Sequence, residues 1–184
     1  MNKYVRVMDG LKSNAGGFEY KLNEINVSDS WNPEAHSGKE FGGFNFTTES
    51  CILRWLHRGS TIYDVEIPKD AEIVKIEGAT ILFRTNKIIV KNPRKVNDDL
   101  ALHYYEISNI PEKSYYKALG AVAVMNYKKT AFKILKDKVN KNNINEVLEE
   151  WNEFIDHDGK NDRKDSNETV KLIERMLLEI KADN

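Results

Sequence analysis

Glycine is distributed unevenly along the 184-residue chain, and this asymmetry constrains the fold more than any other feature. Eight of the ten glycines lie at or before Gly78, where they separate short segments with apolar residues two positions apart. In the remainder of the chain only Gly120 and Gly159 occur, and apolar residues recur at helical spacing. The pattern predicts an α+β protein with a compact, mostly antiparallel sheet over residues 1–95 and an antiparallel helical cluster over residues 96–184.

The predicted strands are short runs bounded by turn residues. They span Tyr4–Met8, Phe18–Leu22, Gly42–Thr48, Thr61–Ile67, Ala79–Thr85 and Lys87–Lys91. The polar segment Asn23–Glu40 is expected to be a long loop. Glu49–Arg58 is expected to form a short amphipathic helix that Gly59 closes.

The predicted helices carry apolar stripes that we interpret as core rather than as binding surface. They span Asn97–Ile107, Pro111–Asn126 and Lys128–Val139, followed by a helix after the capping pair Asn143 and Glu146 and a last helix with Val170, Ile173, Leu177 and Ile180 on one face. A charged loop, Asp156–Asp165, separates the last two helices.

Composition excludes several classes of protein. Charged residues make up 31% of the chain at a net charge of −1, whereas a protein that coats nucleic acid is markedly basic. The single cysteine excludes an internal disulfide and fits a reducing compartment. No apolar run is long enough for a secretory signal or a membrane span, and the four histidines lack metal-ligand spacing. We therefore expect a cytoplasmic protein without a metal site.

Hydroxyl side chains gather where the Gly42–Thr48 strand meets the next helix. Thr47 or Thr48 can cap that helix, with Glu49 complementing the helix dipole. Hydroxyls and free amides at such a junction can also hold a ribose or a phosphate, and the preceding glycine pair would let backbone approach a ligand. Both interpretations stay open at this point.

A second candidate surface is the lysine-rich segment Lys128–Lys141, in which only Asp137 opposes the positive charge. Such a segment is usually the solvated face of a helix. The alternative is contact with the phosphate backbone of RNA or DNA.

The order of motifs in residues 1–95 resembles the compact sheet of ADP-ribosyltransferases. Arg6 lies on the first strand, Phe44-Asn45-Phe46-Thr47-Thr48 runs into a helix, and Ile62–Ile67 forms an edge-like strand. The chain as a whole is also similar to a group of small uncharacterised proteins found in bacteria and large DNA viruses. That similarity includes Gly42-Gly43-Phe44 and Phe83-Arg84-Thr85-Asn86-Lys87.

The resemblance implies chemistry on NAD. Arg6 would bind a phosphate or ribose of NAD, and an aromatic residue would stack on the nicotinamide. The implied NAD-binding residues are Arg6, Phe44, Phe46, Thr47, Thr48 and Tyr63. The family's catalytic glutamate is expected where this chain has Asn86-Lys87. A nearby acid must then stabilise the developing positive charge. The implied catalytic residues are Arg6 and Thr47 together with Glu66 or Asp70. Glu72 and Glu77 are further acids in this region.

The resemblance therefore predicts an NAD-dependent ADP-ribosyltransferase of toxin or effector type, which acts on an intracellular protein or RNA. The missing glutamate supports an alternative, a non-catalytic interaction module with a partner or inhibitor protein. A third hypothesis is an RNA-binding protein that uses Lys128–Lys141.

Overall fold

The computed structural model describes residues 3–13, 17–35, 40, 42–76, 78, 80–157 and 167–183. The chain divides into two compact units. The sheet unit comprises residues 1–52 and 58–95, and the helical unit comprises residues 53–57 and 96–184. The predicted Asp156–Asp165 loop extends beyond the described residues, and Ala79 lies outside them.

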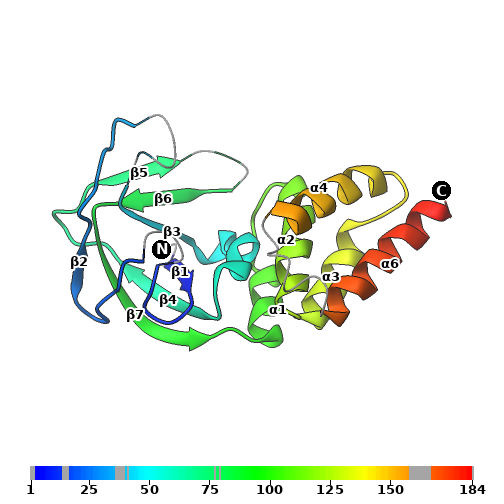
Figure 1. Cartoon of the computed structure of the whole chain (residues 1–184), viewed down its shortest axis with the longest axis horizontal. Coiled ribbons are helices and arrows are strands. Elements are labelled where there is room, and N and C mark those ends of the chain that lie inside the picture. The colour runs from blue at the N-terminus through cyan, green and yellow to red at the C-terminus, as the bar shows by residue number, and fades with distance from the viewer. Residues whose placement is uncertain are drawn as a thin grey trace. The chain divides into compact units, whose positions relative to one another are not determined.

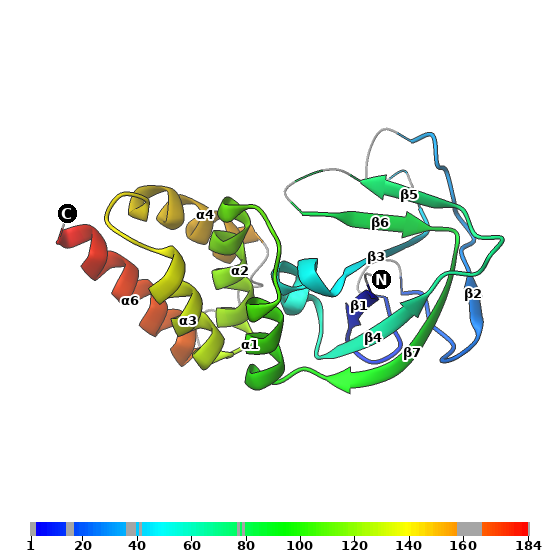
Figure 2. The same cartoon turned by 180° about the vertical axis from the view of Figure 1, so that it is seen from behind.

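The sheet unit is built on one antiparallel sheet with the strand order β2-β7-β4-β1-β3-β6-β5 (Figures 1 and 2). Its strands are β1 (Tyr4–Met8), β2 (Ile25–Val27), β3 (Phe44–Thr48), β4 (Thr61–Glu66), β5 (Ile73–Ile76), β6 (Leu82–Thr85) and β7 (Lys87–Lys95). The α+β class predicted from the glycine pattern is confirmed.

Strand β1 lies at the centre of this sheet, but it is paired unequally on its two sides. It pairs with β4 from Tyr4–Val65 to Met8–Thr61, whereas its pairing with β3 covers only Tyr4–Thr48 and Val5–Thr47. Beyond Val5 the ladder between β1 and β3 ends. Side chains on one face of the sheet form the unit's aromatic core, which contains Met8, Tyr20, Phe44, Phe46, Tyr63, Val65, Ile88 and Val90.

Four predictions about the strands were wrong. The predicted edge-like strand Ile62–Ile67 corresponds to β4, which lies inside the sheet between β7 and β1. Phe18–Leu22 forms only isolated bridges at Glu19 and Leu22, and it is extended because Phe18, Tyr20 and Leu22 pack on the core. Alternating apolar residues indicate a buried face, and they do not require ladder pairing. The predicted loop Asn23–Glu40 contains β2. Strand β5 was missed because Ile73-Val74-Lys75-Ile76 places apolar residues on both faces.

The helical unit contains α-helices at the predicted positions, with slightly shifted ends. They are α1 (Asp98–Glu106), α2 (Glu112–Val124), α3 (Lys128–Lys138), α4 (Ile144–His157) and α6 (Glu168–Ala182). Helix α2 packs against α3, α4 and α6 (Figure 1). Buried side chains from these helices, among them Leu119, Ile134, Trp151 and Ile173, make the unit's core.

The predicted helix over Glu49–Arg58 is not an α-helix. Two 3₁₀ segments, η1 (Glu49–Cys51) and η2 (Leu53–Arg58), take its place. Short connectors often adopt this tighter winding, because few i→i+4 hydrogen bonds can form over so few residues. Gly59 follows in extended conformation, and a side chain there would collide with the backbone of Met8.

Candidate functional site

The most unusual polar group of the sheet unit is the guanidinium of Arg6. It lies just beyond the last β1–β3 pair, where Nη1 donates a hydrogen bond to the Asn45 carbonyl oxygen on β3. The Arg6 Cζ atom lies 5.1 Å from the centroid of the Tyr20 ring. The end of the ladder thus opens a position that a long cationic side chain fills, with an aromatic ring on one side.

Arg6 is a cation without a compensating anion among the described residues. It forms no ion pair with any described acid, and its buried Nε atom has no hydrogen-bond partner there. Burial lowers the pKa of Arg6 from its usual value, although a guanidinium remains charged at neutral pH. A buried charge without a counter-charge is costly, so such a group is a candidate for contact with an anionic ligand.

A second arginine, Arg84, lies on β6. Asn45 and Arg84 are directly opposite each other in the β3–β6 ladder, so their side chains share one face of the sheet, whereas Arg6 lies on the other face with Phe44, Phe46 and Tyr63. Burial lowers the pKa of Arg84, and the nearby positive charge of Arg6 lowers it further. Arg84 Nη1 donates to the Gly42 carbonyl oxygen at 2.8 Å.

The sequence-based site did not include Asn45 or Arg84. Asn45 stands between two aromatic residues and Arg84 between Phe83 and Thr85. A polar residue that interrupts an apolar strand is a signal that could have identified both. The pairing that brings them together joins positions far apart in the sequence, and no pattern within a single strand reveals it.

The aromatic residues implied as NAD-binding lie in the core instead. Phe44 packs edge-to-face on Phe18, and Phe46 is stacked on Phe83 with ring centroids 5.3 Å apart. Both phenylalanines are almost fully buried, as is Tyr63, whose hydroxyl donates to the Gly10 carbonyl oxygen at 2.9 Å. Tyr63 is nevertheless the direct cross-strand neighbour of Arg6. These rings form the apolar surroundings of the arginine and are not exposed for stacking on a ligand.

The two threonines of the predicted junction are buried and hydrogen-bonded. Thr47 Oγ1 donates to the Ile81 carbonyl oxygen at 2.5 Å, and Thr48 Oγ1 lies 3.1 Å from Ser50 Oγ. Thr48 occupies the N-cap position of η1, but its side chain makes no capping hydrogen bond. Both residues therefore hold the end of β3 in place.

The two implied catalytic acids are each held by a lysine. Residues directly opposite in a ladder share a face, so Arg6 lies on the face of Tyr63, and Glu66 lies on the other face of β4. Glu66 forms an ion pair with Lys91, and Asp70 with Lys87 at 2.5 Å. The hydrogen bond from Lys87 holds the pKa of Asp70 below its usual value. The two side chains are 58% and 72% exposed, respectively, and neither forms an ion pair with Arg6.

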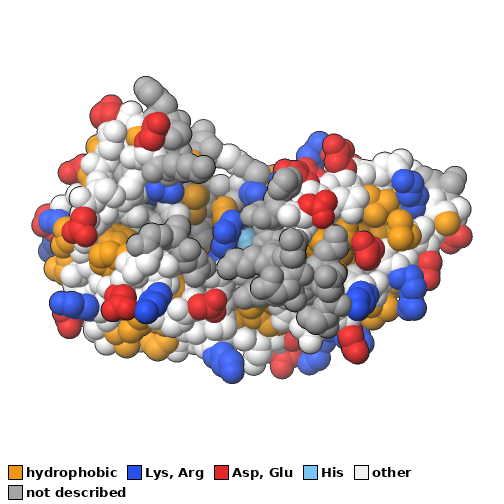
Figure 3. Space-filling view, in the orientation of Figure 1, with side chains coloured by type: hydrophobic (Ala, Val, Ile, Leu, Met, Phe, Trp, Pro, Cys, Tyr) orange, Lys and Arg blue, Asp and Glu red, His pale blue; other side chains and the backbone are white. Residues whose placement is uncertain are grey.

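Three of the six lysines in the segment Lys128–Lys141 form ion pairs with described acids of the helical unit. Lys129 pairs with Asp99, Lys133 with Asp137 and Lys138 with Glu112. On the face drawn in Figure 3, Lys and Arg side chains lie interspersed with Asp and Glu side chains. RNA binding by this segment stays a prediction, and these pairs lower the net charge that it presents.

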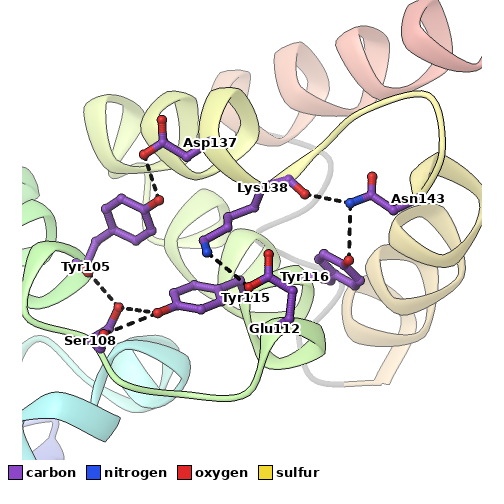
Figure 4. A network of polar contacts seen from close by, with 8 residues as sticks. All are labelled: Tyr105, Ser108, Glu112, Tyr115, Tyr116, Asp137, Lys138 and Asn143. Carbon is purple, nitrogen blue, oxygen red and sulfur yellow. Dashed lines mark hydrogen bonds and ion pairs between the residues drawn. The ribbon is translucent and has the colours of Figure 1, made fainter.

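A polar network joins α1, α2 and α3 inside the helical unit (Figure 4). The Tyr105 hydroxyl donates to Asp137 Oδ2 at 2.8 Å, and the hydroxyls of Ser108 and Tyr115 lie 2.9 Å apart. Lys138 Nζ lies 4.3 Å from the centroid of the Tyr115 ring. Burial, and next to it Asp137, raise the pKa of Tyr105 well above its ordinary value. The hydroxyl and charged groups of this network contact one another, as expected of groups that hold helices together.

The described part of the chain contains no cluster of three or more His, Cys, Asp or Glu side chains that could hold a metal ion. None of the described helices is long and apolar enough to cross a membrane. Comparison of the chain with protein-family models, with curated proteins and with solved structures gives no match.

Proposed function

We propose that the sheet unit binds NAD as an ADP-ribosyltransferase-like module, with Arg6 as the residue that contacts a phosphate of the ligand. The observation that carries the proposal is the Arg6 guanidinium, which lies within the sheet unit without a described acid and with an unpartnered Nε atom. Arginine is well suited to phosphate because its planar fork of N–H groups matches two phosphate oxygens.

The residues near Arg6 suit the phosphates of NAD but not its nicotinamide ring. Arg6 supplies positive charge of the kind that a dinucleotide's phosphates require. Phe44, Phe46 and Tyr63 do not fit a role in stacking on nicotinamide, because all three are buried. Bound NAD would supply an ADP-ribosyl group, which passes to a protein or RNA acceptor as the bond between ribose and nicotinamide breaks and nicotinamide leaves. Glu66 and Asp70 are paired with lysines, and neither forms an ion pair with Arg6.

Isothermal titration calorimetry of the full chain with NAD tests this proposal. Arg6→Lys keeps the positive charge but removes the forked donors, so we expect NAD binding to weaken at least about tenfold. Arg175→Gln is the control, because Arg175 is an exposed arginine of the helical unit and, among the described residues, its ion pair is with Glu179 of its own helix. Absence of NAD binding to the wild-type chain, or equal binding by Arg6→Lys, would overturn the proposal.

The second candidate is a non-catalytic interaction module. One observation favours it: no described acid forms an ion pair with Arg6, although a transferase needs an acid at its reacting centre. If this candidate is correct, NAD-derived label is not transferred to any component of a cell extract, even though NAD binds. Labelling of one macromolecule that disappears with Arg6→Lys would decide for the transferase.

A further inference from the structure

We infer that the outer side of strand β2 binds an extended segment of a partner protein, in which alternate apolar residues lie between two basic residues. We call this side of Ile25–Val27 the β2 edge. The inference goes beyond nucleotide binding, because β7 and β4 separate β2 from the strand that carries Arg6. It follows from the open backbone of the β2 edge, from its exposed apolar side chains and from the charge at its two ends.

The first feature is the open backbone. Strand β2 is the last strand on its side of the sheet and, among the described strands, it pairs only with β7 (Figures 1 and 2). The Ser28 N–H donates to the carbonyl oxygen of Asn86, just before β7, at 2.9 Å. Successive residues of an antiparallel strand point their backbone groups alternately to its two sides, so Asn26 also faces β7. The N–H and C=O groups of Ile25 and Val27 therefore point outward, where a further strand can bond to them.

The second feature is the exposure of the side chains. Ile25 and Val27 are 54% and 53% exposed, and because they are two positions apart they lie on the same face of the sheet. Soluble proteins commonly protect an edge strand with lysine or proline, and β2 contains neither. An added strand with apolar residues opposite Ile25 and Val27 would cover both side chains while its backbone bonds to theirs.

The third feature, charge, decides what kind of strand fits. Glu24 and Asp29 lie just beyond the two ends of β2, are exposed, and form no ion pair with a described residue. If two copies of the chain paired through β2 with Ile25 opposite Val27, the acids of one copy would approach those of the other, and like charges repel. A partner segment with Lys or Arg at both ends places opposite charge there instead. Charge complementarity therefore favours a basic partner strand over a second copy of this chain.

Titration of the full ¹⁵N-labelled chain with two synthetic peptides, followed by NMR, tests the inference. The basic peptide is acetyl-Lys-Thr-Val-Thr-Val-Lys-amide, whose two valines match the spacing of Ile25 and Val27, and the acidic peptide has Glu at both ends. We expect the basic peptide to shift the amide signals of Ile25 and Val27 and to bind at least about fivefold more tightly than the acidic peptide at low salt.

Three results would overturn the inference. They are absence of binding by the basic peptide, equal affinity for the two peptides, and signals of Ile25 and Val27 that shift with protein concentration alone, which would identify a second copy as the occupant. Failure of NAD binding would overturn the proposed function and leave this inference standing, because the two surfaces lie on different strands.

Val27→Pro tests the backbone contact. Proline removes the outward N–H, whereas the bonds to β7 run through Asn26 and Ser28 and are kept. Affinity for the basic peptide should fall at least about fivefold. Val27→Thr is the matched control, because it keeps the N–H and the β-branched shape, and it should bind within about threefold of wild type. Equal affinities of the two variants would contradict pairing at the β2 edge.

The double variant Glu24→Lys/Asp29→Lys tests the charge and keeps the inference falsifiable if the proline variant does not fold. Reversal of the charge at both ends should reverse the preference, so that the acidic peptide binds at least about fivefold more tightly than the basic one. A variant that still prefers the basic peptide would show that these acids do not select the partner.

Discussion

Two sets of polar side chains, one in each unit, differ in how completely they are partnered. In the network of the helical unit, Tyr105 meets Asp137 and Lys138 meets Glu112, so each group has a partner of suitable charge (Figure 4). In the sheet unit, Arg6 forms no ion pair with a described acid and its Nε atom has no partner. A completed network stabilises its unit, whereas an incomplete one costs stability unless something else completes it. The difference makes Arg6 the candidate for contact with a ligand.

The largest expected effect comes from Arg6→Met, which keeps the length of the side chain and removes its charge. Ligand affinity should fall by about 100-fold or more, because charge-assisted hydrogen bonds to phosphate are lost. The free energy of unfolding should stay within about 1 kcal/mol of wild type, since the lost bond to the Asn45 carbonyl is offset by removal of a buried charge. Calorimetry and urea unfolding measure both quantities. A loss of about 3 kcal/mol in the free energy of unfolding would show that the charge of Arg6 stabilises the fold, as the charged groups of the helical unit's network do.

Asp98→Ala should have the next largest effect, on stability alone. Asp98 accepts hydrogen bonds from the backbone of Lys129 at 2.7 Å and of Thr130 at 3.0 Å, and so caps the start of α3 from the neighbouring helix α1. We expect a loss of about 2 kcal/mol in the free energy of unfolding, with unchanged affinity for NAD. Asp99→Ala is the control, because Asp99 forms only an exposed pair with Lys129 and should leave the unfolding midpoint unchanged. Equal effects of the two variants would disprove the cap.

Asp64→Asn tests a carboxylate of the sheet unit that accepts hydrogen bonds from neighbouring side chains. Burial alone would raise the pKa of Asp64, but hydrogen bonds from Asn92, Arg94 and Lys3 outweigh burial and hold it below 3.8. A carboxylate with a lowered pKa adds stability above its unfolded pKa and loses it as the pH falls through the folded value. The variant should be about 1 kcal/mol less stable at pH 7, and this difference should shrink below about pH 4. A stability difference that does not change with pH would contradict a stabilising role for the negative charge of Asp64.

The smallest effect is expected from Glu66→Gln and Asp70→Asn. Both acids are largely exposed and held by lysines, so ligand affinity and the unfolding midpoint should match those of wild type. Calorimetry and thermal unfolding of each single variant check this. Loss of NAD binding in either variant would show that the substituted acid belongs to the NAD site.

Sequence patterns predicted β1 with its observed bounds, the run of β3 into a helical segment, and the helices of the second unit, because each depends on local periodicity. They did not predict which face of β3 the core covers, and so Phe44 and Phe46 were assigned to a ligand although they are buried. The strand order was also beyond prediction, since the β3–β6 pairing joins residues about forty positions apart. For the same reason Arg84 was missed.

The most direct test is the ¹H–¹⁵N spectrum of the arginine Nε–H groups, with the Arg6 signal assigned from its absence in Arg6→Lys. An Nε–H group without a protein acceptor is available to a phosphate. We therefore predict that NAD shifts the Arg6 signal and slows its exchange with water, while the Arg175 signal stays in place. An Arg6 signal that remains unchanged at saturating NAD would contradict the claim that Arg6 contacts the ligand.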